Sequence, residues 1–551
     1  MTAPADAATE QLPAVAALEP SLGRSSSLMA VASLVSRTTG FLRQVALFTV
    51  LGDSILNDSY TVSNTLPNIV YELLIGGVLT SVMVPLLVRS QTTDADGGEA
   101  YTRRLLTLTG VALLLATAVA MLAAPLLIRL YLGSQTTNTA DPQLATMLAY
   151  LLLPQIFFYG TGALLGAILN SRGAFGAFAW APVLNNVVVL AVLGAYLLVP
   201  DRAQLLVLGL GTTLGIVVQA AVLVPAMRRV GFRYRPMWGW DPRLTRAGGL
   251  VLWVVAYVLI GQAGYVVTTR VASASAEGAV TIYTNAWLLL QVPYGVLGVS
   301  LLTALMPRLS RAAAQGRTAE VVSDLALGAR LAAVFLIPVS VLLTVFGTPV
   351  GIALFGLRSA NLDGAAQLGT ALAVSAFGLL PFAIMMLQLR VFYAFTDSRT
   401  PTLIQLFTVG VKVPLLLACP ALLPAEDVVL GLAAANGASF VAGCVLGQLL
   451  LRRRLGPLPT GGVFATAGRT LVAAGTTGMA TYGLVALLDA GPLAGLSPLQ
   501  QAWTVLAVVL VVTVPATVLA MKLLRVPELD PVLRRLERLV NRRKPQRGSG
   551  S

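Results

Sequence analysis

The sequence predicts an all-α polytopic membrane protein with fourteen transmembrane helices, arranged as two six-helix lobes in a parallel repeat plus two extra C-terminal helices. Three observations lead to this prediction. The chain of 551 residues is 56% hydrophobic and only 11% charged, whereas soluble domains carry about 25% charged residues. It contains fourteen apolar stretches that could cross a bilayer, which requires about 20 residues. Two short patterns recur at nearly equal spacings, which indicates an internal repeat.

The predicted helices divide the chain into five regions. Residues 1–24 are polar and rich in Ala and Pro, so we expect a disordered N-terminal tail. The apolar stretches cover residues 28–51, 58–88, 104–131, 145–170, 177–199, 204–227, 247–272, 279–307, 324–355, 365–396, 402–424, 428–451, 466–488 and 500–523. The other regions are an N-lobe (25–235), a C-lobe (236–457), the last two helices (458–525) and a basic cytoplasmic tail (526–551).

The internal repeat relates the two lobes. The pattern from Gly76 to Pro85 has an arginine four residues later, and so does the pattern from Gly298 to Pro307, 222 residues further along. A Leu-Pro pair at 153–154, with Ser-Arg after it at 171–172, recurs 227 residues later. A shift of six helices gives both copies the same orientation, and such halves usually enclose a central cavity. The alternative is chance similarity among helices rich in Leu, Ala and Gly.

Cations in the predicted loops orient the chain. With the N-terminus inside, the outer loops hold only Arg129, Arg202 and Arg358, whereas many arginines fall in the inner loops and the tail. Such an excess is typical of the cytoplasmic side, so we expect a plasma-membrane protein with both termini cytoplasmic. This topology explains the net charge of +14 better than nucleic-acid binding does.

The residue types exclude several chemistries. The chain has no histidine, which rules out imidazole as a base, a metal ligand or a pH switch. Its two cysteines, Cys419 and Cys444, lie in apolar stretches and fit small core residues better than a disulfide or a metal site. No Walker A pattern is present. We therefore expect a protein that is not an enzyme and uses no cofactor or metal.

Charged residues inside the first two apolar stretches are the main functional signal. Arg37 and Arg43 lie in the first stretch, and Asp58 and Glu72 lie in the second. A guanidinium at bilayer depth costs roughly 2.5–3.5 kcal/mol unless it faces a wet cavity or a partner. The two arginines are ~9 Å apart along a helix and ~120° apart around it. Because a guanidinium suits phosphate oxygens, they predict an anion site; an ion pair with either acidic residue is a compatible alternative.

Other polar residues within the spans have open roles. Arg270 lies near the end of the stretch 247–272, which is the counterpart of the stretch 28–51 in the repeat. It could supply a cation that matches Arg37 and Arg43, or its side chain could reach the lipid headgroups. Lys412 lies about ten residues into the stretch 402–424, where a buried ammonium needs a polar or charged partner. It could serve ion coupling, or form a structural bond with neighbouring carbonyls or with Asn436. Asn186 and Asn436 fit interhelical hydrogen bonds.

The motifs around these charges resemble those of the MviN/MurJ family of lipid II flippases. The segment SRTTGFLR at 36–43 resembles the family's S-R-x-x-G-F-x-R opening, and Asp58 with Leu66-Pro67-Asn68 keeps the family's spacing. Further matches are PYGVLGV at 293–299 and FYAFTDSRTP at 392–401. The resemblance covers residues 28 to about 525. It implies the fold of the multidrug/oligosaccharidyl-lipid/polysaccharide exporter superfamily, with a cationic cavity between the lobes and a polyprenyl-tail groove at helices 13 and 14.

The resemblance also implies a function. The substrate would be lipid II, an undecaprenyl-diphosphate-linked peptidoglycan precursor, moved from the cytoplasmic to the outer leaflet by alternating access. Arg37, Arg43 and Asp58 carry over as substrate-binding residues, and Arg270 is our candidate for a further one. The expected partners are the lipid, the bilayer and cell-wall synthesis proteins, with no nucleic acid.

The sequence departs from the family at several positions. Tyr71 and Glu72 stand where many family members have an Arg-Arg pair. Trp287 and Leu288, in the stretch 279–307, stand where many members have an arginine. A sodium site described for some members uses acidic and amide side chains on the helices that correspond to the stretches 247–272, 402–424 and 428–451. Here the stretch 247–272 has no acidic residue, and the stretch 402–424 carries Lys412. We therefore expect coupling to the membrane potential rather than to sodium, with Glu72, Lys412 and Asn436 in coupling or structural roles.

Three other functions stay open on the sequence. The chain could flip another polyprenyl-diphosphate-linked glycan. It could be a multidrug exporter, although exporters of cations tend to use acidic cavity residues. It could also be a non-transporting scaffold for cell-wall enzymes, although a scaffold has no use for unpaired arginines within the membrane.

Overall fold

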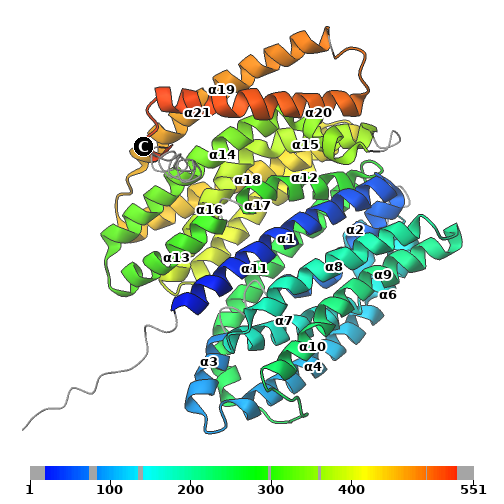
Figure 1. The fold of residues 1–551 in the computed structure, drawn as a ribbon, viewed down its shortest axis with the longest axis vertical. Coiled ribbons are helices and arrows are strands. Elements are labelled where there is room, and N and C mark those ends of the chain that lie inside the picture. Colours follow the sequence, from blue (N-terminus) through cyan, green and yellow to red (C-terminus); the bar gives the residue numbers. More distant parts are fainter. Residues whose placement is uncertain are drawn as a thin grey trace, which may run out of the picture. The chain divides into compact units, whose positions relative to one another are not determined.

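The regular structure of the chain is helical throughout its described part. The computed structural model describes residues 19–73, 84–133, 141–295, 299–357, 362–491 and 493–529, and no strand occurs among them. Figure 1 shows these helices and the connections between them. An all-helical chain is what a bilayer demands, because a helix satisfies all its backbone hydrogen bonds within one segment.

The helices of the first half follow the predicted spans closely. They are α1 (Glu19–Leu51), α2 (Ile55–Leu73), α3 (Val84–Thr93), α4 (Glu99–Leu122), α5 (Ala124–Leu132), α6 (Pro142–Leu152), α7 (Gln155–Ser171), α8 (Phe175–Tyr196), α9 (Asp201–Ala221), α10 (Leu223–Arg229) and α11 (Pro242–Ser273).

The helices of the second half are longer on average. They are α12 (Ala279–Pro293), α13 (Val299–Ala314), α14 (Thr318–Phe355), α15 (Leu362–Ser375), α16 (Leu379–Ala394), α17 (Arg399–Leu422), α18 (Val428–Leu455), α19 (Thr460–Asp489), α20 (Pro498–Val508) and α21 (Val514–Leu523), with short turns η4 (Ala376–Gly378), η5 (Ala425–Asp427), η6 (Val509–Thr513) and η7 (Pro527–Leu529).

Several predicted spans consist of two helices in tandem. The span at 145–170 is α6 followed by α7, with Pro154 between them. A proline has no N–H to continue the helical ladder and its ring crowds the preceding turn. The span at 500–523 contains the π-helical turn η6 just before Pro515. Apolar length therefore predicts where the chain crosses, but prolines decide whether each crossing is continuous.

Eleven helices of the described residues are long and apolar enough to cross a membrane. Three predicted spans are not among the eleven. The first coincides with α1, which carries Arg37 and Arg43. The stretches 58–88 and 279–307 each include residues outside the described set. The helical membrane fold is therefore confirmed, whereas the count of fourteen stays a prediction.

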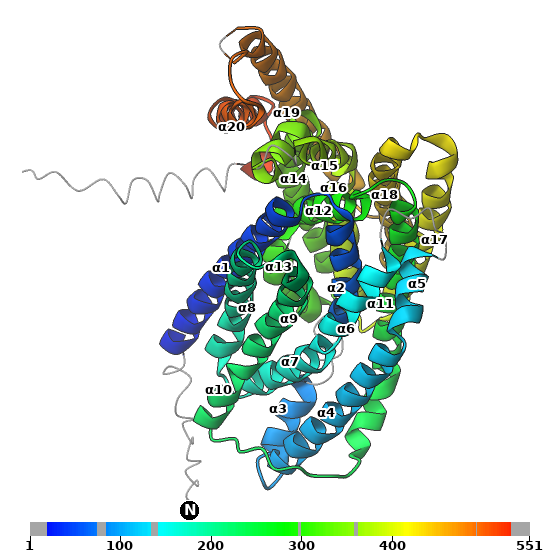
Figure 2. The ribbon, with the colours of Figure 1, turned by 90° about the vertical axis from the view of Figure 1, so that its right-hand side faces the viewer.

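The chain forms two compact units. Unit 1 comprises Met1–Arg43, Leu79–Ala116 and Gln155–Asp241, and unit 2 comprises Gln44–Val78, Thr117–Pro154 and Pro242–Ser551. In unit 1, α9 packs against α7 and α8. In unit 2, α14 packs against α15, α16 and α19, and α17 packs against α11 and α18 (Figures 1 and 2). The division into lobes at residue 235 stays a prediction.

A close crossing of α14 and α15 depends on glycine. A Cβ atom on Gly351 would overlap the carbonyl oxygen of Ala365, and one on Gly347 would lie 2.5 Å from the carbonyl oxygen of Gly369. Small residues let membrane helices approach this closely, so that packing can hold them together.

We expect Gly351→Ala to lower the free energy of unfolding by about 1–3 kcal/mol, because overpacking forces the two backbones apart. Equilibrium unfolding of the purified chain in detergent measures it. Gly475→Ala on α19 is the matched control, since a Cβ there meets nothing within 4 Å. Equal stability of the two variants would contradict the explanation.

The end of the described chain docks back onto α14 and α19. Glu528, whose side chain is buried, lies with its Oε1 3.1 Å from Nε of Arg330 on α14. The Thr466 hydroxyl on α19 donates to the same carboxylate, 3.3 Å from Oε2. We call Arg330, Thr466 and Glu528 the C-terminal clasp. Val526 and Leu529 pack beside it in an apolar cluster with residues of α14, α19 and α21.

Candidate functional site

The SRTTG segment of α1 is fixed to α8 within unit 1. The side-chain amide of Asn186 donates to the carbonyl oxygen of Ser36 at 3.2 Å and to the hydroxyl of Thr39 at 3.0 Å. A Cβ on Gly40 would make only an ordinary contact with this amide, 3.4 Å from its nitrogen. The prediction that Asn186 forms an interhelical hydrogen bond is confirmed, and Thr39 is the side chain of the segment that takes part in it.

This anchored segment carries the two arginines. The Arg37 side chain is exposed and that of Arg43 is half-buried. The Nε atom of Arg43 is buried and has no hydrogen-bond partner among the described residues. A guanidinium with an unsatisfied donor in an apolar helix is costly. The Nε itself is closed to a ligand, so the terminal nitrogens of this half-buried guanidinium are the donors that an anionic ligand can meet.

Asp58 has a different setting, in unit 2. It is fully buried at the start of α2 and accepts a hydrogen bond from the backbone N–H of Thr281 in the first turn of α12, at 2.9 Å. A carboxylate is stabilised there by the free N–H groups and the positive end of the helix dipole. The backbone N–H of Ile55 also donates to Glu277 at 3.3 Å. Asp58 therefore joins the start of α2 to the start of α12.

Gly278 makes this junction close. It immediately precedes α12 with φ +75°, a conformation that L side chains rarely adopt. A Cβ at this position would also lie 2.5 Å from the carbonyl oxygen of Asp53. Gly278 therefore allows both the left-handed backbone conformation and the close contact between this turn and residues 52–55.

Lys412 reaches the same helix. Its ammonium donates to the hydroxyl of Tyr283 at 3.3 Å and lies 5.8 Å from the centre of that ring. The partner is thus a tyrosine of α12 rather than a neighbouring carbonyl or Asn436, which is buried on α18. The structure brings Asp58 and Lys412 to contacts only two residues apart on α12.

The other predicted site residues lie apart from these contacts. Arg270 is exposed near the C-terminal end of α11, in unit 2. The side chain of Glu72 lies outside the described residues. Arg37 and Arg43 belong to unit 1. The substrate-binding roles of the two arginines, Asp58 and Arg270 stay predictions.

An aromatic cluster occupies the position where the resemblance expects an arginine. Trp287 stacks on Phe440 at 5.3 Å between ring centres and meets Phe382 edge-on at 5.4 Å. Tyr294 adds a further edge contact to Phe382 at 4.7 Å. Such pairs stabilise a core beyond the area that they bury. The departure is therefore a packed apolar contact among α12, α16 and α18.

The DSRTP motif has a structural role at the turn between α16 and α17. Asp397 accepts hydrogen bonds from the backbone N–H groups of Arg399 and Thr400, at 3.1 and 3.0 Å. Its other oxygen accepts from the Thr400 hydroxyl at 2.8 Å and from Arg454 at 2.7 Å. Burial alone would raise the pKa of Asp397, but the bonds from Thr400 and Arg454 outweigh it and hold the pKa below its usual range.

A carboxyl with a lowered pKa stabilises the fold above the pKa of the unfolded chain, about 3.9, and loses this contribution as the pH falls. We therefore expect Asp397→Asn to lower the melting temperature at pH 7, and the difference from the parent chain to shrink below about pH 4. Melting curves across this range measure it. Glu426→Gln, at an exposed position, is the control; a difference independent of pH would contradict the explanation.

Metal ligands do not gather in the described part of the chain. Within it, no group of three or more His, Cys, Asp or Glu side chains could hold a metal ion.

Comparisons with known proteins agree on one family. A family model described as lipid II flippase MurJ matches residues 47–521. The probable lipid II flippase MurJ of Haemophilus influenzae is 26% identical over 385 residues, which cover 67% of this chain and 75% of that protein. The counterpart in Rhizobium meliloti is 28% identical over 395 residues, covering 70% and 73%.

Solved structures extend the comparison to the fold. A lipid II flippase MurJ in an inward closed conformation matches with a TM-score of 0.71 and 17% identity, over 92% of this chain and 99% of that one. An inward-facing multidrug resistance MATE transporter of the MOP superfamily matches with a TM-score of 0.57 and 15% identity, over 78% and 94%. At these identities the likeness shows a shared fold.

Proposed function

Since the chain belongs to the lipid II flippase MurJ family, whose model matches residues 47–521, we propose that it moves lipid II across the plasma membrane. The movement is from the cytoplasmic to the outer leaflet, by alternating access. The named relatives and the likeness to a MurJ structure support this function.

The observation that carries the proposal is the state of Arg43. Its half-buried side chain forms no hydrogen bond or ion pair among the described residues, while Asn186 holds the adjoining turn in place. A rigidly placed guanidinium with free donors suits a diphosphate, whose oxygens accept paired hydrogen bonds. We assign Arg37 and Arg43 to the diphosphate of the lipid, with Arg270 as a third cation.

Asp58 acts in the proposal as a conformational residue as well as a substrate-binding one. Its bond to the first turn of α12 links two helix starts that alternating access must rearrange. The Lys412–Tyr283 bond lies two residues further along α12. We assign this ammonium to coupling with the membrane potential rather than with sodium, because moving one charge across the membrane is worth about 2.3 kcal/mol per 100 mV.

The polyprenyl tail is assigned to the last helices. α19 and α20–α21 correspond to the two helices predicted beyond the repeat. An apolar cavity of about 310 Å³ lies at the start of α19, lined also by residues of α14, α16 and α18. Walls of this kind accept hydrocarbon without leaving polar groups unsatisfied.

The proposal includes the arrangement in the membrane. Fourteen helices form two six-helix lobes and the terminal pair, with both termini cytoplasmic, as the arginine-rich inner loops favour. The protein performs transport without a catalytic step or a cofactor. Its partners are lipid II and the bilayer, together with the cell-wall synthesis proteins that supply and consume the lipid.

A transport assay tests the function. Purified chain is reconstituted into liposomes with fluorescent lipid II in the inner leaflet, and a membrane-impermeant reagent reports its arrival outside. We expect transfer well above protein-free liposomes, and loss of it in the Arg37→Ala/Arg43→Ala variant. Transfer of another polyprenyl-diphosphate glycan, but not of lipid II, would favour the alternative flippase; no transfer of either would favour a scaffold.

A further inference from the structure

A second cavity lies in unit 1, and no residue of α1 lines it. Its volume is about 830 Å³, within the range of roughly 300–1,000 Å³ of small-molecule sites. Its walls come from α4, α7, α10 and the segment that follows α10. Gly110, Phe157 and Leu165 line its apolar part, whereas Arg228 and Arg233 line its polar part.

The cavity runs from an apolar interior to a cationic mouth. Arg228 lies in the last turn of α10, and Arg233 follows it in the connection to α11. Both side chains are exposed, and neither forms a hydrogen bond or ion pair within the described ranges. Phe157 and Leu165 lie on α7, up to four turns before that helix ends at Ser171. Because the loops here are rich in arginine, the mouth lies at the predicted cytoplasmic surface.

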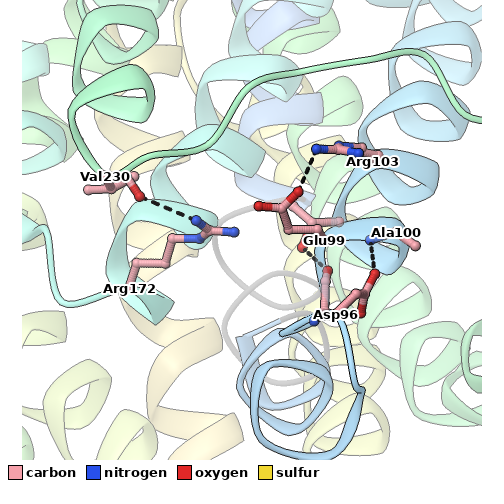
Figure 3. Close-up of polar contacts among 8 residues, drawn as sticks. Asp96, Glu99, Ala100, Arg103, Arg172 and Val230 are labelled. Carbon is pink, nitrogen blue, oxygen red and sulfur yellow. Dashed lines mark hydrogen bonds and ion pairs between the residues drawn. The ribbon is translucent and has the colours of Figure 1, made fainter.

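The connection that forms the mouth is held in place on both sides. Arg172 at the end of α7 donates to the carbonyl oxygen of Val230 at 3.4 Å (Figure 3) and lies over the Phe232 ring at 5.0 Å. On α4, the Thr107 hydroxyl lies 3.0 Å from the hydroxyl of Tyr234. The two arginines are therefore carried on a fixed backbone.

The acidic residues at and just before the start of α4 have local partners. Glu99 pairs with Arg103 on α4, as Figure 3 shows. Asp96 accepts from the backbone N–H groups of Ala100 at 2.7 Å and Gly98 at 3.0 Å. The hydrogen bond from Ala100 lowers the pKa of Asp96, so this carboxyl stays ionised within its own loop. Neither carboxylate therefore pairs with Arg228 or Arg233.

Aromatic side chains beyond the mouth mark a membrane interface. Tyr234, Trp238 and Trp240 lie on the same connection and are 52%, 67% and 68% exposed. Tyrosine and tryptophan favour the headgroup level, where one end of the ring is apolar and the other is wet. An exposed aromatic run beside unpaired arginines fits a lipid surface better than a soluble partner.

We propose that this cavity binds an acidic phospholipid of the cytoplasmic leaflet. The phosphate lies between Arg228 and Arg233, and one acyl chain enters between α4 and α7 beside Gly110. A zwitterionic lipid would bring a choline or ethanolamine cation towards the same arginines, so a net negative headgroup is favoured. The site is separate from the residues assigned to transport.

Native mass spectrometry of the full chain in detergent tests the proposal, with dioleoylphosphatidylglycerol and dioleoylphosphatidylcholine as probes. We expect the parent chain to retain phosphatidylglycerol preferentially. Arg228→Gln/Arg233→Gln should reduce this preference about tenfold or more, since each basic residue near an anionic headgroup contributes substantially. Arg229→Gln/Arg235→Gln removes the same charge from exposed positions that do not line the cavity, and should keep the preference.

A second variant tests the acyl-chain part. Gly110 lines the cavity and a Cβ on it meets nothing within 4 Å, so Gly110→Leu places an apolar side chain at the cavity wall. It should lower retention of phosphatidylglycerol while the melting temperature stays unchanged. Gly194→Leu on α8, also at an open position, is the control.

Three results would overturn the proposal. Equal losses in the two double-arginine variants would indicate surface charge alone. Parental retention in Gly110→Leu would exclude the cavity. Displacement of the lipid by an equal concentration of glycerol phosphate would indicate a site for a free phosphate. Lipid retention is measured without transport, so it is independent of the proposed function.

Discussion

Arg43→Ala is expected to abolish growth of cells that depend on this chain as their flippase, while the protein accumulates normally. The half-buried guanidinium forms no hydrogen bond or ion pair among the described residues, and the substrate has a diphosphate that its terminal nitrogens suit. The same change should leave the free energy of unfolding unaltered or raise it. A charge within a membrane helix costs roughly 2.5–3.5 kcal/mol on insertion scales, and alanine removes that cost. Complementation of a depletion strain, together with melting of the purified variant, measures both effects.

Two controls separate binding from charge. Arg43→Lys keeps a cation but loses the planar fork, so we expect partial growth. Arg202→Ala removes an exposed arginine at the start of α9 and should grow normally. Arg37→Ala is expected to behave as Arg43→Ala does. Full growth of both alanine variants, or a loss of stability equal to the loss of growth, would contradict the assignment.

Asp58→Ala is expected to abolish transport and also to destabilise the chain. The carboxylate is fully buried and accepts the N–H of Thr281. Its removal leaves a helix N-terminus without an acceptor, which costs about 1–3 kcal/mol. Unfolding in detergent and the liposome assay measure the two effects.

Asp58→Asn separates the hydrogen bond from the charge. The amide oxygen can still accept from Thr281, so most of the stability should return: the lost helix-dipole interaction, about 0.3–1 kcal/mol, is offset by removing a charge from a fully buried position. Glu277→Gln, at the exposed contact of the same junction, should change little. An Asp58→Ala variant that melts like the parent chain would show that the bond to α12 does not hold the junction.

The positions of the helices could be predicted from the sequence because the bilayer imposes both length and composition. The starts and ends of α8, α17 and α18 lie within a few residues of the predicted spans. The break at Pro154 could not be read from hydropathy, which does not register a missing N–H. A kinked helix and two separate helices have the same apolar length.

The sequence indicated which charged residues belong to the candidate site, but not which residues they contact. Arg37, Arg43, Asp58 and Lys412 stand out because each is costly in an apolar stretch. Their partners are far away in sequence: Thr281 lies 223 residues after Asp58, and Tyr283 lies 129 residues before Lys412. Neither partner has a composition signal, because a backbone N–H occurs at every non-proline residue and a tyrosine in a membrane helix is common. Packing of α12 against α2, and the reach of the Lys412 side chain from α17 to α12, create these pairs.

The C-terminal clasp determines how force enters the molecule. Because Glu528 is paired with Arg330, residues 330–528 form a noncovalently closed loop that contains α15 to α21. Tension applied beyond residue 529 therefore loads this ion pair and the apolar cluster beside it before it reaches α21. The pull is diverted into α14, the 38-residue helix against which much of unit 2 packs. The two final long helices, α19 and the tandem α20–α21, are thus mechanically shielded.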